Sequence, residues 1–321
     1  MKLYLESCGH RLPKRCVTNE EFTHRVDTSD EWIRQRTGIE TRYLASDVVL
    51  DPEEKLLKSE TLFELTEKAA ASCMEGAKEL RSKVGIVIVA TTSSEERMPA
   101  IAPLLQAPLG LEPDIVCFDL NAACTGFVYA LQMARGYLLD NPDRAALVIG
   151  AEKLSTLLDF DDRGTCILFG DGAAATLWTL GEGEPEVFIS GTESNVDLLH
   201  ADASSPLTME GRQVFRFAVQ TLPELLKALS EKTGVKADLH FLHQANARII
   251  QAVAKALDEP IERFPMNLQH YGNTSAASLP LLLSDLWETG ELDRERFASE
   301  NYTFAGFGAG LSYGGLMTKG L

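Results

Sequence analysis

The chain contains neither a long apolar run nor a paired-cysteine motif. Its longest apolar stretches, such as Val84 to Ala90, are far too short to span a bilayer. The six cysteines show no Cys-x-x-Cys spacing, and no secretory hydrophobic segment precedes them. We therefore expect reduced thiols in a cytoplasmic protein rather than a disulfide framework or a membrane span.

Basic residues are scarce as well. The chain has 30 lysines and arginines and 47 aspartates and glutamates, which gives a net charge of −17. We therefore expect neither nucleic acid nor a membrane as a partner. A length of 321 residues with 45% hydrophobic content allows a large core in one domain or two. Strand-like runs alternate with helical ones, which predicts an α/β fold with mostly parallel sheets. The spacing of Asp162 and Asp171 does not suggest a metal site.

Cys124 lies in the most informative local setting. A β-branched and apolar run over 114–120 predicts a buried strand, the apolar spacing over 127–139 predicts a helix, and small residues surround the cysteine between them. A thiol at a helix N-terminus is stabilised as thiolate, so we expect a lowered pKa and a nucleophile. The remaining cysteines are interpreted as small buried hydrophobic residues: Cys8, Cys16, Cys73, Cys117 and Cys166.

An imidazole and a carboxamide have similar settings. His243 follows a strand-like run over 237–242 and precedes a helix from about Asn246 to Leu257, and Asn273 lies in a turn that leads into an apolar helix. A lone histidine or asparagine is more often a satisfied structural group. Three strand-to-helix turns, each with a different reactive side chain, favour one assembled site.

These motifs, taken together and in order, resemble a known family. The segments that carry the likeness are 27–33 with 36–39, the turn around Cys124, 162–165 with 169–173, the two motifs at His243 and Asn273, and the glycine turn at 306–310. Over almost its whole length the chain resembles the β-ketoacyl-acyl-carrier-protein synthase III enzymes of the thiolase superfamily. The resemblance implies a duplicated thiolase-like α/β fold in five layers, αβαβα. Its halves would be 1–180 with the cysteine and 181–321 with the histidine and asparagine, and the acidic glycine-containing stretch 181–185 marks the boundary.

The resemblance also implies a reaction. Cys124 would take an acyl group from an acyl-CoA primer, and malonyl-acyl-carrier-protein would then lose carbon dioxide and attack that group, giving a β-ketoacyl-acyl-carrier-protein that starts fatty acid synthesis. His243 and Asn273 suit the enolate as neutral donors. The backbone of Cys124 and Ala309 would form the oxyanion hole, where alanine is tolerated if its φ is negative. The family uses no cofactor or metal beyond the coenzyme A thioester substrate, and a homodimer is implied.

A coenzyme A site is expected near the N-terminus. Thr28 and Glu31 have the spacing of a capping box, so a helix should begin there and place Trp32 one turn from Arg36. The indole would stack on adenine and the guanidinium would bind phosphate. By resemblance, the coenzyme A site comprises Thr28, Trp32, Arg36, Arg163 as a second wall for adenine, and Arg248.

Two further surfaces are predicted. Met98 and Phe169 would line the acyl pocket, and because relatives often have phenylalanine where this chain has Met98, longer or branched primers are expected beside acetyl-CoA. The segment 190–208 looks shorter than in many relatives. Helical spacing beside the His243 motif predicts a basic patch that would dock the acidic carrier protein, formed by Arg212, Arg216, Arg248 and Lys255.

Other functions stay open on sequence alone. A specialised acyltransferase of secondary metabolism would carry the same motifs. A cysteine hydrolase also uses Cys, His and Asn in this order, although the papain-type signature around the cysteine is absent. A non-catalytic carrier-binding relative would not need all three side chains, and hydroxymethylglutaryl-CoA synthase would need a glutamate base that the sequence does not reveal. Primer length, branching and pathway are not specified.

Overall fold

Two β-sheets form the frame of the computed structural model, which describes residues 1–50, 58–202 and 205–321. The first sheet has the order β1-β7-β6-β4-β5 and the second the order β11-β12-β13-β8. The strands of the first are β1 (Lys2–Arg11), β7 (Gly172–Gly181), β6 (Ala145–Glu152), β4 (Val84–Ala90) and β5 (Val116–Leu120). Those of the second are β11 (Leu239–Leu242), β12 (Tyr302–Gly308), β13 (Ser312–Met317) and β8 (Val187–Thr192).

Both sheets are mixed, so the expectation of mostly parallel sheets is wrong. In the first, β4 runs parallel to β5 and β6, while β7 runs antiparallel to β1 and β6. In the second, only β11 and β12 are parallel. The antiparallel pairing of β12 with β13 arises because a short turn, rather than a crossover helix, joins them.

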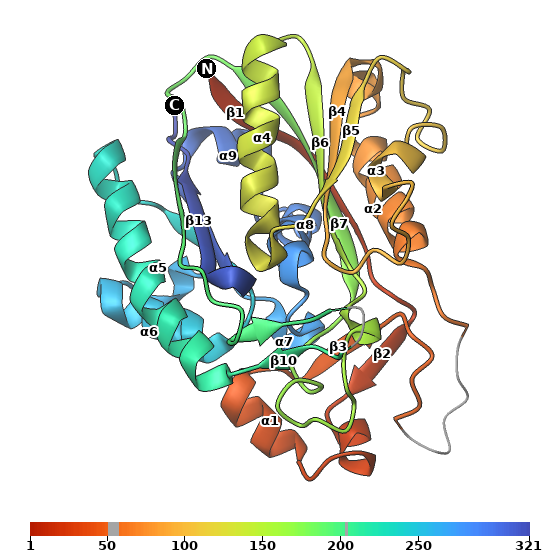
Figure 1. Cartoon of the computed structure of the whole chain (residues 1–321). Helices are drawn as coiled ribbons and strands as arrows, with labels where there is room; N and C mark the ends of the chain where they lie inside the picture. The colour runs from red at the N-terminus through yellow and green to blue at the C-terminus, as the bar shows by residue number, and fades with distance from the viewer. Residues whose placement is uncertain (51–57, 203–204) are drawn as a thin grey trace.

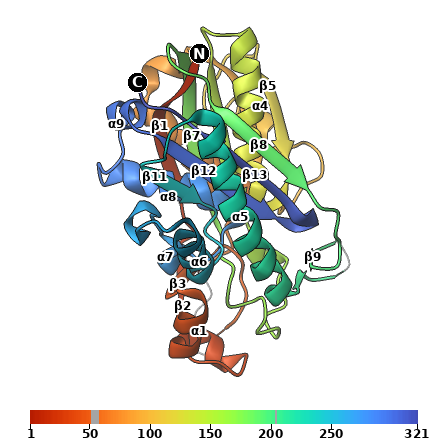
Figure 2. The same ribbon diagram turned by 90° about the vertical axis from the view of Figure 1, so that its left-hand side faces the viewer.

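The helices complete five layers (Figures 1 and 2). The helix α4 (Gly126–Asp140) and the helix α8 (Ser278–Glu288) lie between the sheets and contact strands of both. The helix α2 (Leu62–Gly76) covers the outer face of the first sheet, α5 (Gly211–Thr233) covers the second, and α6 (Ala247–Leu257) packs against α5. The predicted αβαβα order is confirmed.

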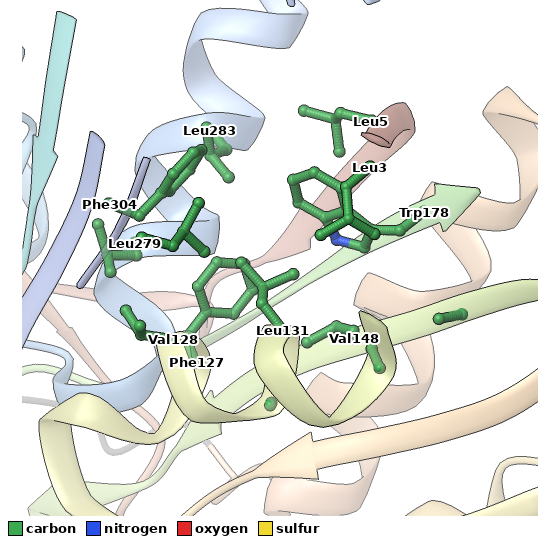
Figure 3. Packing of buried hydrophobic residues seen from close by; sticks show 14 of the residues in the cluster. Leu3, Leu5, Phe127, Val128, Leu131, Val148, Trp178, Leu279, Leu283 and Phe304 are labelled. Atoms are coloured by element: carbon green, nitrogen blue, oxygen red, sulfur yellow. The ribbon is translucent and has the colours of Figure 1, made fainter. Parts of the chain in front are cut away.

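The middle layer is the centre of the core, as Figure 3 shows. Phe127 and Leu131 of α4 and Leu279 of α8 belong to one buried cluster with Trp178 of the first sheet and Phe304 of the second. Burying each such side chain contributes roughly 1.5–3 kcal/mol. This packing fixes the N-terminal ends of α4 and α8, where the site is found.

Shorter elements surround this frame. The strands β2 (Arg15–Thr18) and β3 (Thr41–Leu44) pair with each other, as do β9 (Leu199–His200) and β10 (Thr208–Met209). The short helices are α1 (Asp30–Thr37), α3 (Ile101–Leu104), α7 (Leu268–Tyr271) and α9 (Arg294–Ser299). The 3₁₀ turns are η1 (Glu20–His24), η2 (Lys78–Lys83), η3 (Ala123–Thr125), η4 (Leu154–Thr156), η5 (Ile261–Arg263), η6 (Ser275–Ala277) and η7 (Ala309–Leu311).

The two central helices begin in the same way. Ala123 opens η3 with a φ of 46° and Ser275 opens η6 with a φ of 47°, and each 3₁₀ turn continues directly into α4 or α8. This repeat supports the predicted duplication. The strands of the first sheet end at Gly181 and those of the second begin at Val187, so the proposed division at 180/181 falls beside the 182–186 connection.

Two predictions about general properties can be compared with the described residues. Within the described ranges, no helix combines the length and apolarity needed to cross a membrane. All six cysteines are free thiols, but Cys16 is exposed and Cys117 is partly exposed, so the expectation that they are buried holds only for Cys8, Cys73 and Cys166. The strand β5 that precedes Cys124 lies at a sheet edge and is half-buried rather than buried.

Candidate active site

Cys124 lies where two cavities meet. It belongs to η3, between the end of β5 and the start of α4, and is 7% exposed. One cavity of about 440 Å³ and another of about 390 Å³ both include Cys124 in their lining. Phe169 and Leu199 are shared by the two linings as well. A substrate that reaches the thiol through one cavity can therefore place a transferred group in the other.

The resting form of Cys124 is the thiol. Burial raises its pKa to about 12, and the negative charge of nearby Glu152 adds to the rise. The prediction of a lowered pKa is therefore wrong, because the loss of hydration outweighs the field of the helix N-terminus. The Sγ–H donates to Ser275 Oγ at 3.4 Å.

His243 is a neutral imidazole held in one orientation. It follows β11, as predicted, and burial lowers its pKa to about 3. Its Nδ1 lies 2.7 Å from Ser278 Oγ, and that oxygen also accepts from the backbone N–H of Gln244. In the tautomer in which the Ser278 hydroxyl donates to Nδ1, Nε2 carries the proton and faces the substrate as a donor. His243 lines the larger cavity.

Asn273 is oriented by its carboxamide oxygen. Oδ1 accepts from the backbone N–H of Ser275 at 2.9 Å, which leaves Nδ2 as the free donor. Among the described residues no acceptor is bonded to Nδ2, and Asn273 lines the same cavity as Cys124 and His243. Asn273 follows the short helix α7 and pairs with Phe169 by an isolated bridge, so the strand expected before this turn is absent there.

The terminal glycine turn lies against the cysteine. A Cβ on Gly308 would come within 2.8 Å of the Cys124 backbone nitrogen, so only glycine permits this approach. Gly310 takes the left-handed conformation with a φ of 74°, whereas Ala309 does not have a positive φ. The condition set for Ala309 is therefore met, and its assignment to the oxyanion hole stays a prediction.

The larger cavity has a cationic and aromatic rim. The guanidinium carbons of Arg36 and Arg163 lie 4.6 Å and 4.8 Å from the Trp32 ring centroid. Arg212 and Arg248 also line this cavity. An indole with cations on its faces is suited to a phosphate-bearing aromatic ligand.

Thr28 does not take its predicted place. The helix α1 begins at Asp30, and Ser29 is the residue whose side chain accepts from the Trp32 backbone N–H. Thr28 is absent from the lining of the larger cavity, and its hydroxyl is buried without a hydrogen-bond partner. The prediction of a capping box at Thr28 and Glu31 is therefore wrong, because the N-cap residue is Ser29 and the helix starts one residue later than expected.

The smaller cavity contains one of the two predicted acyl-pocket residues. Phe169 lines it with Leu154 and Leu207, which belong to the same buried cluster. Met98 is 86% exposed and lines neither cavity of this chain. The segment 190–208 contributes Ser194, Val196 and Leu199 to the cavity, while residues 203–204 lie outside the described residues.

The predicted docking residues lie on two neighbouring helices. Arg212 and Arg216 are exposed near the start of α5, and Arg248 and Lys255 are exposed on α6, which packs against α5. Within the described part of the chain none of the four forms an ion pair. Arg216 and Lys255 lie outside the cavity lining, whereas Arg212 and Arg248 belong to it.

Comparison with known proteins assigns the chain to a family. The model described as 3-oxoacyl-[acyl-carrier-protein (ACP)] synthase III matches residues 118–196, and its C-terminal counterpart matches 231–319. The β-ketoacyl-[acyl-carrier-protein] synthase III of Acholeplasma laidlawii is 39% identical, with 98% of this chain and 97% of that protein covered. The chain belongs to the 3-oxoacyl-[acyl-carrier-protein] synthase III family.

Solved structures agree with this assignment. The synthase III from Aquifex aeolicus VF5 has a TM-score of 0.89 at 36% identity and covers 99% of each chain. The priming β-ketosynthase of the R1128 polyketide biosynthetic pathway has a TM-score of 0.85 at 29% identity and covers 99% of this chain and 96% of its own. The synthase III family assignment makes this chain an acyltransferase with a thiolase-like fold.

Three residues of the site were missed by sequence reasoning. Ser275 and Ser278 lie in the Asn273 motif and contact Cys124 and His243. Glu152 ends the otherwise apolar strand β6 and is fully buried. A single charged residue at the end of such a strand was the available signal. Within the described residues, no group of histidine, cysteine, aspartate and glutamate is arranged to hold a metal.

Proposed function

We propose that this chain condenses an acyl-CoA primer with malonyl-acyl-carrier-protein to give a β-ketoacyl-acyl-carrier-protein, with release of coenzyme A and carbon dioxide. One observation carries the proposal: a cysteine at the junction of two cavities shares the larger cavity with a neutral imidazole and a free carboxamide donor. Thioester exchange needs the first group, and enolate formation needs the other two.

The first half-reaction is acyl transfer. The Cys124 sulfur attacks the acyl carbon, the carbonyl oxygen becomes an oxyanion, and the bond to the coenzyme A sulfur breaks. The backbone N–H groups of Cys124 and Ala309 are proposed as donors to that oxyanion. The acyl chain then occupies the smaller cavity beside Phe169 and Leu154.

The second half-reaction is decarboxylative condensation. Loss of carbon dioxide leaves negative charge on the malonyl thioester oxygen. His243 Nε2–H and Asn273 Nδ2–H donate to this oxygen without surrendering a proton, since the imidazole is already neutral. The enolate carbon attacks the acyl-cysteine and releases the product thioester.

The rim of the larger cavity supports the proposed coenzyme A site. Adenine would stack on the Trp32 indole, with Arg163 on the other side of the base and Arg36 nearby. Because Arg163 now contacts the indole, its guanidinium must move away for the base to enter. Arg248 contributes to the same rim, while Arg212, Arg216 and Lys255 would attract the acidic carrier protein. A cytoplasmic location stays a prediction.

A homodimer is part of the proposal. The strand β5 is the last in its sheet, and its Val116 is 45% exposed. The helix α3 packs against β5 and is preceded by the exposed Met98. An unpaired edge with exposed apolar side chains is suited to pairing with a second copy. In such a dimer Met98 would reach the acyl cavity of the partner chain rather than its own.

The alternatives fit less well. In a cysteine hydrolase the asparagine orients the histidine, whereas here the Nδ1 of His243 is bound to Ser278 and Asn273 is bound to Ser275. Priming in secondary metabolism would use the same half-reactions, and the similarity to a polyketide priming synthase keeps that pathway open.

Intact-mass measurement of the acyl-enzyme tests the proposal. A panel of acyl-CoA thioesters of different length and branching should add one acyl group to the wild type and none to Cys124→Ala. The His243→Ala and Asn273→Ala variants should still be acylated but should lose decarboxylation of malonyl-acyl-carrier-protein. An equal loss of both steps in both variants would instead support a hydrolase, in which the histidine is the base for the cysteine.

A further inference from the structure

The Cys124 thiol must lose a proton before it attacks, and among the described residues its side-chain hydrogen bond goes to Ser275 and not to His243. The Nδ1 of His243 is bound to Ser278, and burial keeps the pKa of this imidazole near 3. Within the described residues, the Ser275 hydroxyl is the one side-chain group to which the thiol donates. The proton therefore has one route through side chains, and it begins at Ser275.

Glu152 lies at the other side of Ser275. The turn η6, which begins at Ser275, packs against β6, which ends at Glu152. Hydrogen bonding from the Ser275 side chain acts to lower the pKa of the Glu152 carboxyl, and the charge of Glu152 acts to raise the pKa of the Cys124 thiol. Glu152 is 0% exposed and lines neither cavity. Glu152 is therefore not exposed to substrate in either cavity, and a proton can reach it from the thiol through Ser275.

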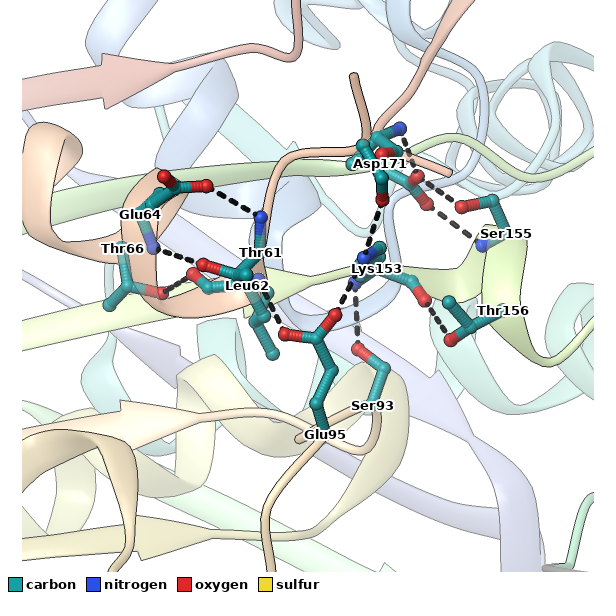
Figure 4. Close-up of polar contacts among 12 residues, drawn as sticks. Thr61, Leu62, Glu64, Thr66, Ser93, Glu95, Lys153, Ser155, Thr156 and Asp171 are labelled. Atoms are coloured by element: carbon teal, nitrogen blue, oxygen red, sulfur yellow. Dashed lines mark hydrogen bonds and ion pairs between the residues drawn. The ribbon is translucent and has the colours of Figure 1, made fainter. Parts of the chain in front are cut away.

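The carboxylate is held firmly in place. Its Oε2 accepts from Ser93 Oγ at 2.6 Å and from the Thr92 backbone N–H at 3.1 Å, with further contacts from the hydroxyls of Thr91 and Thr92. These donors stabilise the ionised form although burial raises the pKa of Glu152. The adjacent ammonium of Lys153 is directed to Glu95 (Figure 4) and to Ser59, and within the described residues Glu152 forms no ion pair.

The backbone of Ser275 is strained in a way that fixes its hydroxyl. A φ of 47° is uncommon for a residue other than glycine. The backbone N–H of Ser275 is bound to Asn273 Oδ1 at 2.9 Å. This backbone conformation and this hydrogen bond hold Ser275 in one orientation beside Cys124.

We propose that Glu152 accepts the Cys124 proton through the Ser275 hydroxyl at the start of acyl transfer. The S–H bond breaks as the proton passes to Ser275 Oγ, and the proton already on that oxygen passes to the Glu152 carboxylate. The thiolate then attacks the acyl carbon. When the bond to the coenzyme A sulfur breaks, the proton returns through Ser275 to that sulfur, so coenzyme A leaves as a thiol and Glu152 is again ionised.

This inference rests on the proposed function, and two variants test it. Glu152→Gln keeps the shape of the acceptor but cannot hold the proton, and Ser275→Ala removes the connecting hydroxyl. Single-turnover acylation should slow by roughly 10²-fold in each, in the range of general acid-base effects, with little change in the KM for acyl-CoA. A variant whose melting temperature equals that of the wild type has an intact fold.

Alkylation of Cys124 by iodoacetamide distinguishes a relay from a simple charge effect. If Glu152 acted only as a fixed negative charge, its removal would lower the thiol pKa and speed alkylation. The relay predicts the opposite sign: both variants alkylate more slowly than the wild type at neutral pH. Glu186→Gln, which changes another buried glutamate outside both cavities, is the matched control and should leave both rates at the wild-type level.

Each outcome decides the proposal. Unchanged or faster alkylation in Glu152→Gln, or normal acylation in Ser275→Ala, would overturn the relay. If Glu152→Gln does not fold, Ser275→Ala decides alone. If no acyl-CoA acylates the wild type but both variants alkylate slowly, the relay stands and the proposed condensation fails, because alkylation requires no substrate.

Discussion

Replacing His243 with glutamine should alter how stability depends on pH. The buried imidazole has its pKa lowered to about 3 from a usual value of 6.5. Between these values the unfolded chain binds a proton at His243 and the folded chain does not. The contribution of His243 to the free energy of unfolding is therefore fully present above pH 6.5, and it is lost as the pH decreases toward 3.

The size of this effect follows from the pKa difference. Each unit of pH between the two pKa values corresponds to about 1.4 kcal/mol. From pH 6.5 to pH 5.0 the wild type should lose about 2 kcal/mol through His243 alone. Glutamine does not titrate, and it can still accept from the hydroxyl of Ser278, so His243→Gln should not show this loss.

The assay is urea unfolding of both proteins from pH 5.0 to 7.5. Taking the difference between wild type and variant cancels the titration of all other groups. For each pH unit below pH 6, the free energy of unfolding of the wild type should decrease by about 1.4 kcal/mol relative to that of His243→Gln. Asn273→Ala changes the same cavity without changing a titrating group, so its difference from the wild type should be independent of pH. A flat difference for His243→Gln would refute the neutral imidazole, and a difference that favours the wild type at low pH would indicate a stable imidazolium.

Three further predictions concern the ligands. Trp32→Ala should raise the KM for acyl-CoA roughly 5- to 150-fold, since stacking of a base on an aromatic ring contributes about 1–3 kcal/mol, while acylation by short N-acetylcysteamine thioesters should be unaffected. Arg216→Glu with Arg248→Glu should raise the KM for malonyl-acyl-carrier-protein far more than that for a small malonyl thioester, and the wild-type KM should rise with salt; equal effects would place these arginines at the thioester instead. Met98→Phe should narrow the primer range toward acetyl-CoA, and a wild type that already accepts only acetyl-CoA would contradict this reading.

The grouping of Cys124, His243 and Asn273 at one cavity was predictable because each lies in a local pattern. A strand, a small-residue turn and a helix around Cys124, and a strand followed by a helix around His243, are readable within about twenty residues. The structure places Cys124, His243 and Asn273 on one cavity. The five-layer fold followed from the resemblance rather than from periodicity, since the sequence pattern alone favoured mostly parallel sheets.

The properties that depend on tertiary environment were not predictable in the same way. The pKa of the Cys124 thiol is raised, whereas the sequence predicted a lowered pKa. The burial that raises it comes from the packing of η6 and the glycine turn on η3, and these segments are far from Cys124 in sequence. The exposure of Met98 outside both cavities was likewise not apparent from its neighbours in sequence. The N-cap of α1 is Ser29 rather than the predicted Thr28, because both adjacent residues carry a hydroxyl that can cap the helix.

A neutral resting site follows from the same burial that hides the cysteine. Removal of water raises the pKa of Cys124 and lowers that of His243, so neither carries charge before substrate arrives. A neutral imidazole is the better donor to an enolate, because it stabilises the developing charge without being quenched by a thiolate beside it. The same environment leaves the cysteine without an imidazole base, and in the proposed relay the buried Glu152 carboxylate would take that role through Ser275. Under the proposed mechanism, burial separates the two proton requirements of the reaction: acyl transfer would depend on Glu152, and condensation would depend on His243 and Asn273.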